Sequence, residues 1–227
     1  MKQLPESDPE PTPGAVTTDG STRDFLAVAV LFLGNGLIVG TFGGSLPGLR
    51  SLLDLGPSGI VGVLVAAALF AVLSMNVSGP LADRYGARLP SLVGGVMMVV
   101  AAVVMGLAPN YAVLVVGAAV FGLGNGGMDV SMNALGVTVE QARRRPVMSR
   151  LHACFSIGNL AGALVVVVLG QLLAEGTATR VSLWTGGVLL AAHSSLQRAM
   201  LVPVVTAVGL IVMSTRLPAD PTDKAAA

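Results

Sequence analysis

Long apolar stretches separated by short polar segments constrain the fold of this chain more than any other feature. A transmembrane helix needs about 20 mostly apolar residues. Stretches of about that length cover residues 25–47, 58–78, 89–107, 111–139 and 152–173. Only 11% of the residues are charged, whereas soluble domains usually carry about 25%. These features predict an all-α integral membrane protein that is surrounded by the lipid bilayer.

The apolar pattern becomes less regular toward the C-terminus. Residues 200–214 form a short apolar run, which we predict to be the sixth span. Residues 181–192 are also apolar, but they are few for a span and contain Gly186 and Gly187. We interpret them as a loop or interfacial segment with Trp184 at the level of the lipid headgroups. An extra, seventh membrane segment is the competing interpretation.

Basic residues are distributed unevenly between the segments that join the spans. With the N-terminus in the cytoplasm, Arg50, Arg180 and Arg198 fall outside. A larger set falls inside: Lys2, Arg23, Arg84, Arg88, Arg143, Arg144, Arg145, Arg150, Arg216 and Lys224. Because cytoplasmic loops carry an excess of lysine and arginine, we expect both termini to be cytoplasmic and the number of spans to be even. The expected location is the plasma (inner) membrane of the cell, crossed several times.

Polar segments flank the predicted bundle. Residues 1–22 are acidic and rich in proline, a composition that cannot bury enough apolar surface to fold. We therefore expect a disordered cytoplasmic tail over residues 1–22, a six-helix transmembrane bundle over 23–216, and a cytoplasmic C-terminal tail over 217–227.

A short internal repeat links the first and fourth predicted spans. Residues 33–36 read Leu-Gly-Asn-Gly, and residues 123–126 repeat these residue types. Inverted repeats of three helices occur within the six-helix halves of some transporter families. We interpret the match as the trace of such a 3+3 inverted repeat, with a chance match between abundant residue types as the alternative.

Glycines four residues apart recur in several spans. Small residues at this spacing let transmembrane helices approach closely. We expect close helix packing at Gly36/Gly40, Gly40/Gly44, Gly122/Gly126 and Gly158/Gly162.

The most specific motif lies between the second and third predicted spans. Residues 79–88, the signature segment, read Gly-Pro-Leu-Ala-Asp-Arg-Tyr-Gly-Ala-Arg. The segment resembles the signature loop of the major facilitator superfamily, G-x-L-A-D-R-x-G-x-R. It is followed by Leu89, where many members carry another basic residue. The resemblance implies the N-terminal six-helix half of a twelve-helix fold. It also implies a conformational latch between the two halves, formed here by Gly79, Asp83, Arg84, Gly86 and Arg88.

The same resemblance implies a function. It predicts half of a secondary active transporter, a permease that moves a small polar solute by alternating access. Residues 140–162 are more weakly similar to sugar-permease-like bacterial members, which assigns no substrate. Because such transporters bind their solute between two halves, the expected partner is a second six-helix half or a second copy of this chain. The alternative is a six-helix membrane protein that does not transport, either a truncated remnant or a regulatory or binding subunit.

Polar side chains within the predicted spans are the candidate site. Asp129 is the only acid well inside an apolar stretch, and a carboxylate at the centre of a membrane helix costs about 2.5–3.5 kcal/mol on insertion scales. Residues three or four positions apart share one side of a helix. We expect the following to line a substrate cavity, or alternatively to make structural hydrogen bonds: Asn35, Asn125, Asp129, Asn133, Ser156 and Asn159.

A histidine is the second titratable group of this candidate site. His152 is expected to enter the membrane at the same depth as Asp129. Such a pair can gate the inner mouth or relay a proton. The alternative is a solvated histidine at the start of a helix.

Several classes of function are not expected. The sequence has no Walker loop, metal-ligand cluster or nucleophile–base arrangement, so we expect no enzyme activity, no cofactor and no metal. Aromatic residues make up 4% of the chain, too few for the stacking surfaces that bind single-stranded nucleic acid. The single cysteine, Cys154, is interpreted as a small buried hydrophobic residue.

Overall fold

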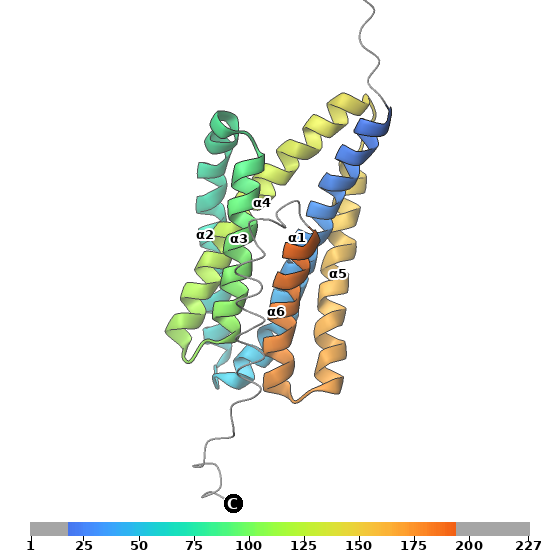
Figure 1. Cartoon of the computed structure of the whole chain (residues 1–227). Coiled ribbons are helices and arrows are strands. Elements are labelled where there is room, and N and C mark those ends of the chain that lie inside the picture. Colours follow the sequence, from blue (N-terminus) through green and yellow to red (C-terminus); the bar gives the residue numbers. More distant parts are fainter. Residues whose placement is uncertain (1–17, 194–227) are drawn as a thin grey trace, which may run out of the picture.

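The computed structural model describes residues 18–193, and this part of the chain folds into six α-helices joined by short turns (Figure 1). The first five are long and apolar enough to cross a membrane. The all-α membrane fold is therefore confirmed, whereas the predicted span over 200–214 and the tail over 217–227 lie outside the described residues. The helices are α1 (Thr18–Leu52), α2 (Pro57–Tyr85), α3 (Arg88–Gly106), α4 (Tyr111–Arg143), α5 (Met148–Leu172) and α6 (Glu175–His193).

Helix α6 corrects the interpretation of residues 181–192 as a loop or interfacial segment. The whole segment is helical, and Trp184 is buried, with 8% of its surface exposed. Its indole nitrogen lies near Gly106 of α3. Gly186, which counted against a membrane helix, instead lets α6 pack closely on Thr41 of α1.

The helix was missed because its apolar run is short and contains Gly186 and Gly187, whereas the helix itself extends back to Glu175. Ser182 and Thr185 each donate a hydrogen bond of 2.7 Å to the carbonyl four residues earlier in the same helix. Such bonds satisfy the hydroxyls inside the bundle without a partner from another helix.

The helices alternate in direction, so their connections gather at two ends of the bundle (Figure 1). The α1–α2, α3–α4 and α5–α6 turns lie at one end, near Arg50 and Arg180. The other end, which we call the basic end, holds the start of α1 and the α2–α3 and α4–α5 turns. Its basic residues are Arg23, Arg84, Arg88, Arg143, Arg144, Arg145 and Arg150.

Two pairs of crossing helices repeat the same close contact. Helix α1 packs most extensively on α5, and α4 packs most extensively on α2. Gly36 of α1 lies against the backbone carbonyl of Phe155, and Gly126 of α4 lies against that of Ala71. A Cβ at either glycine would collide with that oxygen, so both positions require close backbone approach.

The register of the two crossings is also the same. The carbonyl of Leu33 lies against Gly158 of α5, and the carbonyl of Leu123 accepts a hydrogen bond of 2.6 Å from Ser74 Oγ of α2. The offset of 90 residues that relates Leu33 to Leu123 also relates the two glycines above. Because α4 runs opposite to α1, the bundle is the 3+3 inverted repeat that the Leu-Gly-Asn-Gly match predicted.

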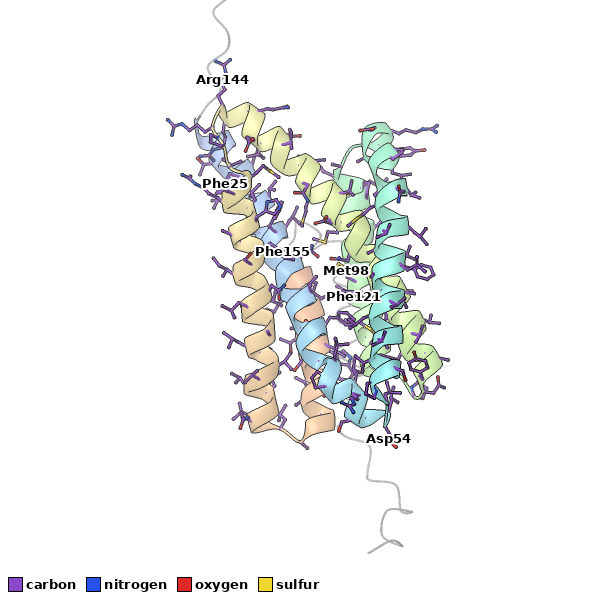
Figure 2. The ribbon with its side chains drawn as sticks, turned by 180° about the vertical axis from the view of Figure 1, so that it is seen from behind. Phe25, Asp54, Met98, Phe121, Arg144 and Phe155 are labelled. Carbon is purple, nitrogen blue, oxygen red and sulfur yellow. The ribbon has the colours of Figure 1, made fainter. Side chains whose placement is uncertain are left out.

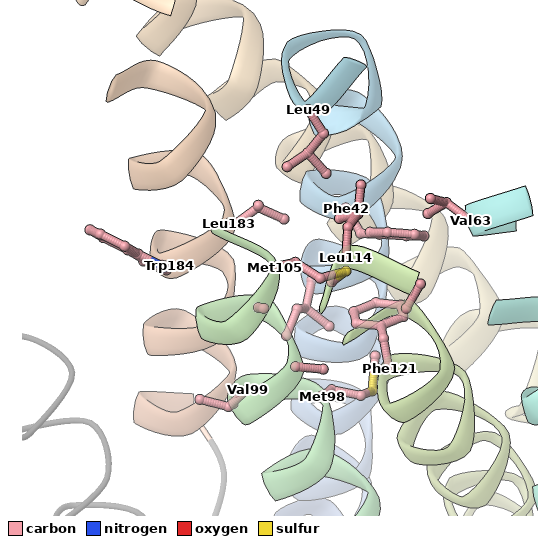
Figure 3. Close-up of a cluster of buried hydrophobic side chains, with 14 of the residues drawn as sticks. Phe42, Leu49, Val63, Met98, Val99, Met105, Leu114, Phe121, Leu183 and Trp184 are labelled. Carbon is pink, nitrogen blue, oxygen red and sulfur yellow. The ribbon is translucent and has the colours of Figure 1, made fainter. Parts of the chain in front are cut away.

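Two apolar clusters hold the bundle together. The larger one joins α1, α3, α4 and α6 with Val63 of α2, and in it the ring centroids of Phe42 and Phe121 lie 4.6 Å apart (Figure 3). The smaller one lies toward the basic end and joins α1, α4 and α5. It contains Val28, Ala29, Phe32, Met132, Val139, Val147 and Leu151.

Helices α2 and α5 lie on the outside of the bundle. Only 6% of the apolar window of α2 and 11% of that of α5 is buried, against 50%, 56% and 50% for α1, α3 and α4. These two helices therefore present most of their surfaces to lipid or to another bundle.

Candidate functional site

The outward surface of α5 is divided into a polar and an apolar side. The inner face carries Gly158 and Gly162, which pack on α1. One outward side carries side chains at steps of four and three residues: His152, Ser156 and Asn159. The adjacent side carries exposed apolar side chains: Ile157, Leu160, Leu164 and Val168. The two outward sides of α5 therefore differ in polarity. Polar side chains are unfavourable where a membrane helix faces only lipid.

The three candidate residues of α4 are half-buried. Asn133 Nδ2 donates to the backbone carbonyl of Asp129 at 2.8 Å and lies 3.4 Å from its carboxylate Oδ1. Asn125 lies one turn before Asp129 and is also half-buried. An acid and two amides therefore follow one another along α4.

Helices α4 and α5 are joined by the turn at the basic end, and they carry the two titratable candidates, Asp129 in α4 and His152 near the start of α5. No ion pair or hydrogen bond joins them directly in the part of the chain that the structure describes. His152 is exposed, with Nδ1 3.0 Å from the Met148 carbonyl and its ring edge-on to Phe32 at 5.4 Å. Asp129 therefore lies in the middle part of α4, whereas His152 lies in the first turns of α5, and the two are not joined by direct contact.

Asn35 is the most deeply buried of the candidates, with 1% of its surface exposed. Its Nδ2 lies 3.7 Å from the sulfur of Met132 on α4, and its Oδ1 has no hydrogen-bond partner within residues 18–193. A buried polar atom left without a partner costs about 1–3 kcal/mol. Asn35 therefore holds an unused acceptor between α1 and α4.

The structure connects some of the candidates and separates others. Ser156 Oγ donates to the His152 carbonyl at 3.1 Å, so these two residues form one unit on α5. Asn35 and Asn125 make no hydrogen bond with Asp129 or His152 among the described residues. Among the described residues, hydrogen bonds therefore join the polar set into one pair on α4, Asp129 and Asn133, and one pair on α5, His152 and Ser156.

The signature segment is mostly helical. Helix α2 continues through Pro80 to its last residue, Tyr85, so the loop expected over residues 79–88 is reduced to the turn at Gly86. Gly86 has φ +81°, a conformation that favours glycine. The charged residues of the segment are exposed at the basic end: Asp83, Arg84 and Arg88.

A groove of about 690 Å³ opens at the basic end between α1, α3 and α4. Its walls are mainly leucine, valine and alanine, and its polar lining includes Asp24, Arg88 and Thr138. Arg88 belongs to the signature segment, whereas none of the candidate cavity residues lines this groove. The groove is therefore distinct from the polar set of α4 and α5.

Sequence reasoning missed a polar residue of α2. Asn76 is exposed between Val72 and Val77, and its Nδ2 donates to the Val72 carbonyl at 2.7 Å. Its carbonyl oxygen makes no hydrogen bond in the described region. Asn76 is an amide side chain inside the predicted span over residues 58–78, and that position alone would have identified it.

No metal site is evident in residues 18–193, where no three His, Cys, Asp or Glu side chains are grouped to hold an ion. Cys154 is free and half-buried between His152 and Ser156. Its side chain packs against the smaller apolar cluster, on the side of α5 away from the polar stripe.

Comparison with known proteins gives consistent matches. The family model of the Major Facilitator Superfamily matches residues 25–223. The chain is 32% identical to an uncharacterized transporter (y4wD) of Sinorhizobium fredii, over 60% of this chain and 36% of that protein. It is 30% identical to the membrane protein MosC of Rhizobium meliloti, over 80% of this chain and 44% of that protein.

A third relative is similar over a shorter part of this chain. The chain is 32% identical to an uncharacterized MFS-type transporter of Yersinia pestis, over 44% of this chain and 26% of that protein. In all three cases the match covers less than half of the relative's length.

Proposed function

The chain belongs to the major facilitator superfamily, and on that premise we propose that it forms one six-helix half of a secondary active transporter. The membership confirms the resemblance carried by the signature segment, and it makes the chain a multi-pass membrane protein of a transporter family rather than an enzyme. In the proposed mechanism, this bundle and a second one move a small polar solute by alternating access.

The polar stripe of α5 is the observation that carries the proposal. His152 and Ser156 are exposed on a helix that otherwise shows apolar side chains to the outside. Lipid does not solvate such groups, whereas a water-filled passage between two bundles does. A second six-helix half, or a second copy of this chain, would cover the outer surfaces of α2 and α5 and close that passage.

The solute would bind to amides and hydroxyls from three helices. Asn35 offers an unpaired acceptor at the middle of α1, and Asn125 occupies the equivalent position in α4 under the inverted repeat. Asn133 and Ser156 extend the polar surface toward the basic end, and Asn159 lies at the level where α5 packs on Gly36 and Gly40 of α1. Such a surface suits small polar solutes, because its amides and hydroxyls can donate and accept hydrogen bonds and most of them carry no charge.

Asp129 and His152 are proposed to control the inner mouth of the passage. They are the two titratable groups of the polar set, so a change in protonation of either group would change the electric field at the mouth. A gate and a proton relay are both compatible with this placement, and they differ in whether transport consumes a proton gradient.

The signature segment is proposed to act as the latch between the halves. Asp83, Arg84 and Arg88 are exposed at the end of α2 and the start of α3, where a neighbouring bundle can pair with them. We place this end in the cytoplasm, and both termini with it, because it holds most of the arginines. The membrane is then the plasma or inner membrane.

Untargeted solute uptake tests the proposal. Proteoliposomes containing the purified chain, alone or co-purified with a second six-helix bundle, are incubated with a mixture of polar metabolites, and the trapped solutes are identified by mass spectrometry. Protein-dependent trapping that is lost in Asp129→Asn supports a transporter. A stable monomer that traps nothing in either preparation supports the alternative, a non-transporting binding or regulatory subunit.

A further inference from the structure

Four arginines are concentrated at the connection between α4 and α5. Arg143 ends α4, Arg144 and Arg145 follow it, and Arg150 lies in the first turn of α5. Arg144, Arg145 and Arg150 are exposed, and their side chains form no ion pair within residues 18–193. Figure 2 shows Arg144 at the tip of the basic end, beyond Phe25 and directed away from the helices.

The only acid in this connection is engaged elsewhere. Glu140 Oε2 accepts hydrogen bonds from the backbone N–H groups of Val147 at 2.7 Å and Met148 at 3.0 Å. The carboxylate thereby caps the N-terminus of α5, where the helix dipole also favours a negative charge. The Glu140 carboxylate is therefore directed at the end of α5 rather than at the exposed arginines.

The connection is held in a defined shape. Arg144 has φ +50°, and its backbone N–H donates to the Gln141 carbonyl at 3.2 Å, which ends α4. Val147 is buried in the smaller apolar cluster, and the Arg143 guanidinium lies 5.1 Å from the centre of the Phe25 ring of α1. The exposed arginines therefore project from an anchored turn.

The position of the turn matches the headgroup region of a bilayer. Helix α4 has 33 residues, more than the roughly 20 that cross the hydrocarbon. Its arginine-bearing end therefore extends beyond the hydrocarbon to the level at which lipid phosphates lie. Guanidinium groups bind phosphate oxygens in paired hydrogen bonds, and basic clusters next to membrane helices attract anionic lipids.

We propose that Arg144, Arg145 and Arg150 form a binding site for the phosphate headgroup of an anionic phospholipid. The site requires only that the bundle spans the membrane. It is independent of solute transport, so its failure would leave the proposed function untouched.

Native mass spectrometry of the full chain tests the site. The protein is mixed in detergent with equal amounts of phosphatidylglycerol and phosphatidylcholine, and the bound lipids are counted. Wild-type protein is expected to retain phosphatidylglycerol preferentially. R144Q/R145Q/R150Q is expected to bind it at least about tenfold more weakly, because each arginine near an anionic surface contributes about fivefold. The matched control, R50Q/R180Q, removes arginines from the opposite end and is expected to keep the preference.

Four results would overturn the proposal. If the wild-type protein retains both lipids equally, it has no site that selects an anionic lipid. If the control R50Q/R180Q loses as much phosphatidylglycerol as the triple variant, the position of the arginines does not matter. Displacement of the lipid by millimolar inorganic phosphate assigns the arginines to a free anion. A triple variant that already melts at a lower temperature without lipid, followed by the fluorescence of Trp184, indicates that these arginines contact protein instead.

Discussion

Gly36 of α1 and Gly126 of α4 occupy equivalent positions in the two halves of the bundle. Each lies against a backbone carbonyl of the helix that crosses it, Phe155 of α5 in one case and Ala71 of α2 in the other. The equivalence relates the buried helices α1 and α4 and the outer helices α2 and α5 by one inverted repeat. It also explains why the same two helices, α2 and α5, lie on the outside of the bundle.

The glycine contacts predict a specific loss of stability. Gly36→Ala forces a Cβ against the Phe155 carbonyl, and overpacking of this kind costs about 1–3 kcal/mol. Thermal unfolding in detergent, followed by the fluorescence of Trp184, the only tryptophan, measures the effect. Gly43→Ala is the control, because a Cβ at Gly43 meets no atom within 4 Å. Equal melting temperatures for the two variants would contradict the close contact.

The cap on α5 predicts a local effect. Glu140→Ala removes the carboxylate that accepts from the amides of Val147 and Met148, so both N–H groups lose their cap. Hydrogen exchange at these two amides should therefore become faster. Gln141→Ala, one residue later on an exposed position, should leave their exchange unchanged, and faster exchange in both variants would indicate general fraying of α4.

Asn35 predicts opposite effects on stability and transport. Its buried Oδ1 has no partner in the described structure, so Asn35→Leu removes an unpaired polar atom and should leave the melting temperature unchanged or higher. Solute uptake should fall, because the acceptor is lost. A variant that melts at a lower temperature and transports in proportion to its folded amount would assign Asn35 a structural role.

The Asp129–His152 region predicts a pH-dependent transport rate. If Asp129 and His152 relay a proton or gate the mouth by changing protonation, uptake by the wild-type protein should vary with pH. His152→Gln should flatten the profile, whereas Ser156→Ala, which removes the neighbouring hydroxyl, should shift the rate without flattening it. A wild-type rate that is independent of pH would exclude both the proton relay and a gate controlled by protonation.

Much of the fold could be predicted from the sequence because its signals are local. The five spans follow from apolar length, and Gly36 and Gly126 follow from glycine spacing and the repeated Leu-Gly-Asn-Gly segment. Helix α6 was not predicted, because its apolar run is short and contains Gly186 and Gly187, and the packing of Gly186 on Thr41 is a contact between distant residues. The signature segment was likewise expected to be a loop, whereas Pro80 lies within α2 and only the turn at Gly86 interrupts the helices.

The site could be predicted only in part, because its arrangement depends on contacts between distant residues. Asp129, His152 and Ser156 were identified as polar residues inside apolar stretches. Their relative placement depends on how α4 and α5 pack around α1, which spacing along one helix does not reveal. The capping role of Glu140 was missed for the same reason, since it requires the turn at Arg144 to fold the chain back onto the carboxylate.

The reactivity of two neighbouring positions on α5 tests the central claim most directly. Ser156→Cys and Ile157→Cys, each in a Cys154→Ser background, are exposed to a hydrophilic, membrane-impermeant thiol reagent in native membranes opened to both sides. The polar stripe is proposed to line an aqueous passage, so Ser156→Cys should react rapidly while Ile157→Cys, on the apolar side, should remain protected by lipid. If both cysteines are equally unreactive, the stripe faces lipid or protein, and the claim that this bundle forms one wall of a transport passage is contradicted.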